Sequence, residues 1–243
     1  MALWDDQAGQ SAQQRAYGFI RNGIMNGTLE GGTKLNPATI AEELGISRMP
    51  VREALVQLDA EGLVTNRPNR GAVVTPMTPD DVEELFEIRA CLEGIAARHA
   101  ATRFTAADLE ELQSLSLRLN RPFADVRAWL KIHDQFHDIL GAISGKRRLL
   151  NEIRRIRMSA HPYLLLYISV YHETEMQGAE HDSLLAALQT RNGILVERIV
   201  VDHILTAGRG VIGFLRQRED ENKESLRRST KSKTPPLMQG EKA

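Results

Sequence analysis

The hydrophobic pattern of this chain changes at one proline-rich point, and that change most constrains the fold. Two prolines fall within four residues in the segment Thr75-Pro76-Met77-Thr78-Pro79, which favours neither a helix nor a central strand. From Asp80 onward, apolar residues recur at helical spacing for about 140 residues, and no alternating strand pattern interrupts them. We therefore expect a mainly α protein in which an antiparallel helical bundle follows a separate N-terminal unit.

The N-terminal part predicts three helices followed by a small hairpin. Residues 11–25 carry a helical apolar stripe, and the segment Pro37–Leu44 begins with the proline that is favoured at a first helical position. Ser47 is a suitable capping residue for the third helix. Short β-prone runs at 63–65 and 72–74 flank a turn-rich segment. Two short helices joined by a tight turn and followed by a hairpin are the outline of a winged helix-turn-helix.

The helical part begins with the apolar stripe Leu85, Ile88, Leu92, Ile95 and Ala96, and a second stripe follows at 109–119. Later helices are expected at about 123–143, 147–170, 177–190 and 192–218, with Pro162 kinking or interrupting one of them. The polar, lysine-rich tail lacks the apolar residues that offset ordering entropy. We therefore divide the chain into a flexible N-terminus at 1–10, the winged helix-turn-helix at 11–75, a linker at 76–80, the helical domain at 81–220 and a disordered tail at 221–243.

Composition excludes several classes of protein. The single Cys91 rules out a disulfide framework and a multi-cysteine zinc site. No apolar run reaches the roughly 20 residues that cross a bilayer, and the acidic start MALWDD is unlike a signal peptide, so we expect a soluble, cytoplasmic protein with no membrane partner. The net charge of −1 excludes coating of nucleic acid by bulk charge. Residues 1–62 hold five Lys and Arg but eight Asp and Glu, so any DNA affinity must come from a few placed arginines and from dimerisation.

The third helix offers a candidate DNA-reading face. Arg48 and Arg52 are one turn apart, and an arginine fork matches the two acceptors that guanine presents in the major groove. The first turn of the helix suits a phosphate, and the hairpin tip is placed to reach a neighbouring groove. The alternative is a solvated face on which the arginines pair with Glu43 or Glu53. The candidate DNA-binding residues are Ser47, Arg48, Met49, Arg52, Arg70 and Gly71.

Four histidines of the helical part form a candidate metal site. They are His133, His137, His181 and His203, on three predicted helices. His133 and His137 are separated by four residues, which places both imidazoles on one helix face. Imidazoles converging inside a bundle suit a mononuclear divalent metal. The alternative is that lone histidines on helices cap, pack or face solvent.

The N-terminal part resembles the DNA-binding half of the GntR superfamily of transcription regulators. The resemblance rests on SRMPVREAL, on the L-x-x-EGLV pattern that follows it and on the RGA-V wing. It implies that Arg48, Met49 and Arg52 read bases or phosphates, and that Arg70 and Gly71 form the wing tip. Met49 stands where the family usually has Thr, which implies a different operator base at that position.

The helical part resembles the FCD effector domain of the FadR-like branch of that superfamily. The segments that carry the resemblance are IRACLEGIAARHAA, HDQFHDIL, EHDSLLAAL and DHI. It implies a bundle around a ligand pocket, often with zinc, nickel or manganese. His133 stands where the branch has an aspartate; Asp134 is the alternative first ligand. Arg89 stands at a position where the family often has arginine, and there it is expected to bind a carboxylate effector or, alternatively, to pair with Glu93 on a solvated face.

The sequence thus predicts a ligand-responsive transcription regulator, acting as a repressor and binding a palindromic double-stranded DNA operator as a homodimer. A small carboxylate or sugar acid would be its effector. The alternative function is a metal-dependent enzyme built on the histidines. We expect no catalytic residues and no enzyme, because the chain has no HExxH, GxSxG, GxGxxG or complete Walker motif. A purely structural helical protein would leave the SRMPVR segment unexplained.

Overall fold

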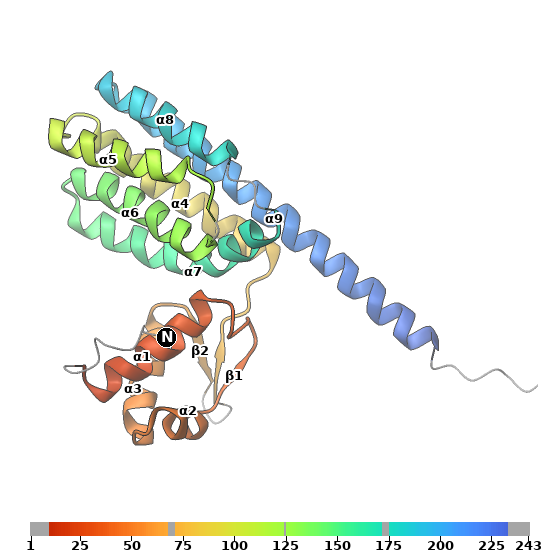
Figure 1. Cartoon of the computed structure of the whole chain (residues 1–243). Helices are drawn as coiled ribbons and strands as arrows, with labels where there is room; N and C mark the ends of the chain where they lie inside the picture. The colour runs from red at the N-terminus through yellow and green to blue at the C-terminus, as the bar shows by residue number, and fades with distance from the viewer. Residues whose placement is uncertain (1–9, 68–70, 124, 172–174, 233–243) are drawn as a thin grey trace, which may run out of the picture.

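The structure, a computed structural model, describes residues 10–67, 71–123, 125–171 and 175–232. Figure 1 shows two units joined by a short linker, with a long C-terminal helix that projects beyond the rest. The N-terminal unit comprises residues 10–75, and the helical unit runs from residue 79 to the end of the described chain. Two separate hydrophobic clusters correspond to the two units.

The N-terminal unit contains the three helices and the hairpin that the sequence predicts. Its elements are α1 (Ala12–Met25), β1 (Lys34–Leu35), α2 (Pro37–Leu44), α3 (Arg48–Ala60), β2 (Val64–Arg67) and β3 (Gly71–Val74). The strands form an antiparallel sheet in the order β1-β3-β2, with Thr65 and Lys34 both opposite Val73. Strand β1 was not predicted, because two residues are too short to show an alternating pattern.

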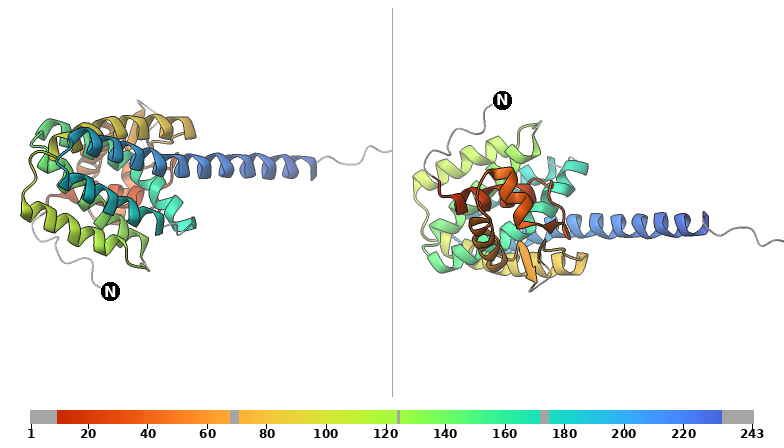
Figure 2. Two further views of the ribbon diagram at one scale, coloured as in Figure 1. Left: turned by 90° about the horizontal axis from the view of Figure 1, so that it is seen from above. Right: turned by 90° about the horizontal axis from the view of Figure 1, so that it is seen from below.

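The helical unit consists of α4 (Pro79–Ala100), α5 (Ala106–Leu119), α6 (Val126–Ile143), α7 (Arg147–Tyr171), α8 (Glu175–Gln189) and α9 (Gly193–Ser232). Within its described residues no strand is present. Figure 2 shows the N-terminal unit on one side of this bundle. Among the described residues, no helix combines the length and apolar character that a membrane span requires.

Helix α4 packs against α9 along small residues. A Cβ added at Gly94 would lie 2.7 Å from Val201 Cγ2, and one at Gly208 would lie 2.9 Å from Phe86. With α9 packed this closely, part of the expected apolar stripe of α4 does not face the interior. Ile88, at the centre of the stripe, is 40% exposed, whereas Arg89 and Glu93 are buried. The predicted inner face of α4 was therefore partly wrong: Val82, Phe86 and small residues such as Ala90 and Ala97 occupy the interior, whereas Leu85, Ile88, Leu92 and Ile95 lie on its edge.

Two further expectations for the helices fail. Helix α7 runs continuously through Pro162, so the expected interruption does not occur; only one backbone donor is lost there, and residues on both sides pack in the bundle. Helix α9 continues to Ser232, so the segment from Glu221 to Ser232 is helical and not disordered. Its many Glu, Lys, Arg and Leu residues have high helix propensity, and they extend a helix already formed against α4. Residues 233–243 lie outside the described residues.

Candidate DNA-reading surface and histidine cluster

Helix α3 separates an apolar face from an exposed basic one. Val51, Leu55 and Leu58 are buried, while Arg48, Met49 and Arg52 are exposed on the other side. Met49 is 63% exposed, which is unusual for its type and leaves it available for contact. Within the described part of the chain, neither arginine forms an ion pair, so the alternative pairing with Glu43 or Glu53 is absent.

Ser47 and the wing lie at the two ends of this surface. Ser47 departs from the prediction, and part of the wing lies outside the described residues. Ser47 occupies the N-cap position of α3 but makes no side-chain capping bond, so the predicted capping contact is absent, while its contact with DNA stays a prediction. Gly71 is exposed with φ of 83°, a conformation that favours glycine. Arg70 lies outside the described residues, so the wing tip itself stays a prediction.

The four predicted histidines converge inside the helical unit. His133 and His137 come from α6, His181 from α8 and His203 from α9, and all four are buried. One ligand atom from each lies within 4.8 Å of the corresponding atom of every other. This spacing would allow one metal ion to bind between the four imidazoles after small side-chain adjustments.

Carboxylates outside the cluster orient two of the imidazoles. His137 Nδ1 lies 2.9 Å from Glu93 Oε2, and His203 Nδ1 lies 2.5 Å from Glu180 Oε2. An ionised carboxylate only accepts hydrogen bonds, so each Nδ1 carries the proton and each Nε2 keeps its lone pair. A carboxylate that holds a histidine in this tautomer is typical of metal sites. The buried His137 Nε2 makes no hydrogen bond within the described residues, which is expected of a nitrogen whose lone pair binds a metal.

Burial keeps the imidazoles of α6 neutral. It lowers the pKa of His137 to about 3, although the carboxylate of Glu93 opposes the shift. Burial likewise lowers the pKa of His133, opposed by Asp134. Neutral imidazole is the form that binds a metal, so these residues need not lose a proton at neutral pH.

Asp134, the alternative first ligand, lies outside the cluster. Its Oδ2 is 3.2 Å from His161 Nδ1, and its side chain is 34% exposed. Burial alone would raise the pKa of Asp134, but the neighbouring imidazoles of His133 and His161 hold it below its ordinary value. The geometry therefore favours His133 over Asp134. His161, which the sequence left without a role, is the partner of Asp134.

Arg89 pairs with Glu93, which was the alternative to its expected effector-binding role, but the pair lies in the interior. The Arg89 Nε–Glu93 Oε1 distance is 3.1 Å, with side-chain exposures of 3% and 5%, so the pair is not on a solvated face. Burial alone would raise the pKa of Glu93, yet Arg157, Arg89 and His137 hold it well below its ordinary value. The same carboxylate thus neutralises an arginine and orients a possible metal ligand.

Sequence reasoning missed Arg157, the second buried arginine beside Glu93. Its Nη1 donates to Asp138 Oδ1 at 2.8 Å and to the Asp134 carbonyl, and its Nε lies 3.7 Å from Glu93 Oε1. Nε and Nη2 are buried and make no hydrogen bond within the described residues. Arg157 sits in the basic run RRIRM, where nothing in the sequence distinguishes it from its exposed neighbours.

The fold and the two sites define the class: a winged helix-turn-helix protein with an all-helical second domain that contains a cluster of four histidines. Residues 12–74 match the model of bacterial regulatory proteins of the gntR family, and residues 84–206 match the FCD domain. The chain therefore belongs to the GntR family of transcription regulators and carries an FCD domain, as the sequence predicted.

Relatives and solved structures agree with this assignment. The chain is 27% identical to the HTH-type transcriptional repressor RspR of Escherichia coli K12 over 218 residues, which are 88% of this chain and 93% of that protein. It is similar to the solved structure of E. coli McbR/YncC, with a TM-score of 0.70 at 22% identity over 86% of this chain and 99% of the other, which supports the fold. A GntR family regulator from Pseudomonas syringae pv. tomato has a TM-score of 0.55 at 26% identity, covering 87% and 89% of the two chains. The family and these relatives are transcriptional regulators and not enzymes.

Proposed function

We propose that this DNA-binding regulator is a repressor that binds a palindromic operator as a homodimer and is released by a small anionic effector. The observation that carries the proposal is the exposed, unpaired face of Arg48, Met49 and Arg52 on α3, in a chain whose family binds DNA. In the major groove, the two arginines would bind base edges or phosphates. Ser47, Arg70 and Gly71 are proposed to contact the DNA backbone or the neighbouring groove. Such a protein would act in the cytoplasm, with the chromosome.

We propose further that the four histidines hold one divalent metal ion, such as zinc, nickel or manganese. Support comes from the convergence of the four side chains, the neutral state of His133 and His137, and the carboxylates that orient His137 and His203. The bound ion would supply positive charge and open coordination positions for an anionic effector. The residues of this chain would hold the ion and orient its ligands.

The effector would be a small carboxylate or sugar acid. Arg89 and Arg157 place two buried positive charges beside the histidine cluster; among the described residues Glu93 is the one buried carboxylate between them, and the partly buried Asp138 also pairs with Arg157. The unpaired Nη2 of Arg157 is a donor that an anion would satisfy. An effector would change DNA affinity only in so far as it binds the two orientations of the N-terminal units differently.

For the dimer interface we propose the exposed apolar edge of α4. Ile88 is 40% exposed, and Leu85, Leu92 and Ile95 beside it are half-buried. Large apolar residues aligned along one exposed helix edge are typical of a contact between subunits. A second copy packed there would bring two α3 helices to one operator.

Selection of binding sequences from random DNA with the purified full-length protein tests the regulator proposal. We expect a short palindromic site and loss of binding on addition of an effector acid. Candidate acids would be added one at a time, with each neutral amide as the control. Absence of any sequence preference at physiological salt would refute the proposal.

A further inference from the structure

A pocket of about 220 Å³ lies between the two units, away from the histidine cluster. The buried side chains of Ile24, Leu63 and Val74 close it on the side of the N-terminal unit. Tyr163 and Leu166 of α7 line the opposite side. None of the four clustered histidines lines it. We infer that this pocket is a second ligand site, for a small organic acid with an apolar body.

The pocket stays open because glycines border it. A Cβ added at Gly27 would meet no atom within 4 Å, and one at Gly62 would come no closer than 3.9 Å, to Ser159 Oγ. Both glycines have positive φ, 72° and 79°, so the backbone itself favours glycine at these points. The consequence is that no side chain at these two positions fills the space between the units.

The lining indicates the chemistry of the ligand. An apolar cavity of about 150 Å³ holds benzene, so this pocket has room for an aromatic ring or short alkyl chain with a small polar group. Tyr163 accepts a hydrogen bond from the Met77 N–H at 3.1 Å, and its own O–H is left to donate. Burial raises the pKa of Tyr163, so the hydroxyl stays protonated.

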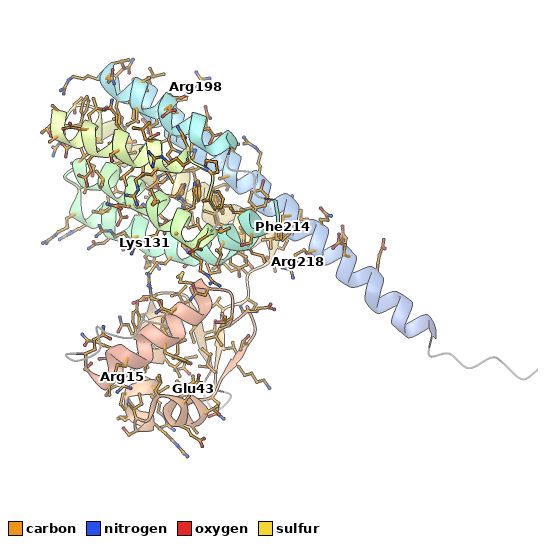
Figure 3. All side chains as sticks on the ribbon, in the orientation of Figure 1. Arg15, Glu43, Lys131, Arg198, Phe214 and Arg218 are labelled. Atoms are coloured by element: carbon orange, nitrogen blue, oxygen red, sulfur yellow. The ribbon has the colours of Figure 1, made fainter. Side chains whose placement is uncertain are left out.

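The guanidinium of Arg218 supplies the positive charge. Arg218 lines the pocket from α9, and its Cζ lies 5.7 Å from the Phe214 ring centroid. Figure 3 shows both residues on α9 near the linker. Glu30 also borders the pocket, and both Glu30 and Arg218 are exposed, so solvent screens the two charges alike and the preference for an anion rests on Arg218 together with the Tyr163 hydroxyl donor. A cation and a hydroxyl donor above an apolar floor match a carboxylate with an apolar tail.

A ligand here would hold the two units in this orientation. Few polar contacts join the two units in the part of the chain that the structure describes. One is the bond from Met77 to Tyr163. In addition, Arg21 Nη2 lies 3.3 Å from Met158 Sδ, and Arg127 Nη2 donates to the Asn26 carbonyl at 3.3 Å. A ligand that contacts both units binds more tightly to the arrangement in which the pocket exists, and so it stabilises that arrangement. The pocket would therefore couple a second chemical signal to the placement of α3.

Calorimetric titration of the full-length, metal-free protein with phenylacetate, and with phenylacetamide as the neutral isostere, tests the inference. We expect Leu166→Trp, which fills the pocket, to weaken phenylacetate binding by about tenfold or more. Ser159→Leu fills it from a different position and guards against misfolding of the first variant. Arg218→Gln is expected to weaken binding of the acid, and not of the amide, by about threefold or more.

His181→Ala and Arg209→Gln serve as controls and should leave phenylacetate binding unchanged. Arg209 lies on the same helix as Arg218, is exposed and bonds to Thr206 instead of lining the pocket. Absence of phenylacetate binding at millimolar concentration, or binding that resists both filling variants, would overturn the site. Loss of binding in His181→Ala alone would assign the acid to the histidine cluster. Equal effects of Arg218→Gln on acid and amide would overturn the assignment of an anion.

Discussion

Glu93 of α4 accepts a hydrogen bond from His137 of α6 through an Oε2–Nδ1 contact of 2.9 Å. The other carboxylate oxygen of Glu93 is 3.1 Å from Arg89 Nε and 3.7 Å from Arg157 Nε. One buried carboxylate therefore joins α4, α6 and α7, lies between two guanidinium groups and orients an imidazole of the cluster.

Glu93→Gln should destabilise the protein and weaken metal binding. The amide cannot neutralise Arg89 and Arg157, and a buried unpaired charge costs about 3–5 kcal/mol. Loss of the carboxylate that orients His137 should lower metal affinity about 10- to 100-fold. Urea denaturation of the metal-free protein and competitive metal titration measure the two effects. The matched control is Glu152→Gln, which removes a half-exposed pair with Arg155 and should cost about 0–1 kcal/mol. Equal losses in the two variants would contradict this account.

Trp129 should report metal binding by its fluorescence. Its ring stacks on His133 at a centroid distance of 5.2 Å, and the side chain is 1% exposed. A paramagnetic ion such as Ni²⁺ bound to His133 would quench it at this distance. The measurement uses a Trp4→Phe background, which leaves Trp129 as the single tryptophan. His181→Ala should shift the titration to much higher metal concentration, whereas quenching that is unchanged in this variant would place the ion elsewhere.

The metal-free protein should lose stability as the pH falls from 6.5 to 5. The pKa of His137 is lowered to about 3 in the folded state, so in this range the unfolded chain takes up a proton that the folded chain does not. Stability is complete above pH 6.5 and falls by up to about 1.4 kcal/mol per pH unit for each such imidazole. Denaturant midpoints across the range measure the slope. His137→Gln should make it shallower; an unchanged slope would exclude this histidine as its source.

Arg52→Ala should cost about 1–3 kcal/mol at one operator position, through loss of a bidentate base contact. Binding to a set of single-base operator variants, followed by fluorescence anisotropy, would show that the preference at this position relaxes. Uniform weakening across all the sequences would instead assign Arg52 to a phosphate. Arg155→Ala, on the exposed side of α7, is the control and should not change DNA affinity.

Ile88→Asp should shift the protein toward the monomer, because a charge would be buried where two apolar edges meet. Sedimentation at several concentrations measures the association, and operator affinity should fall with it. Leu117→Asp is the control, since Leu117 is 65% exposed on α5, away from the proposed interface. A dimer that survives Ile88→Asp would exclude this edge of α4.

The local elements were largely predictable from particular residues. The N-cap bond from Asn36 and the Pro37 start of α2 form as expected, since both depend only on neighbouring backbone. The four histidines were predictable as a set because spacing by four on α6 and the family resemblance agreed. The choice between His133 and Asp134 needed the position of His161, a residue on α7 whose contact with Asp134 no local pattern shows.

The amino-acid sequence by itself determined the order of the helices, the hairpin and the class of protein, because apolar period, caps and turn residues act over a few positions. Only the tertiary structure decided which face of α4 is interior, since that depends on how closely Gly94 and Gly208 let α4 and α9 approach. The same holds for Arg157 and Glu93, whose charges act on the histidines only because three helices bring them together. Contacts between segments that are distant in the chain leave no periodic pattern in the sequence, so they can be identified only from the folded structure.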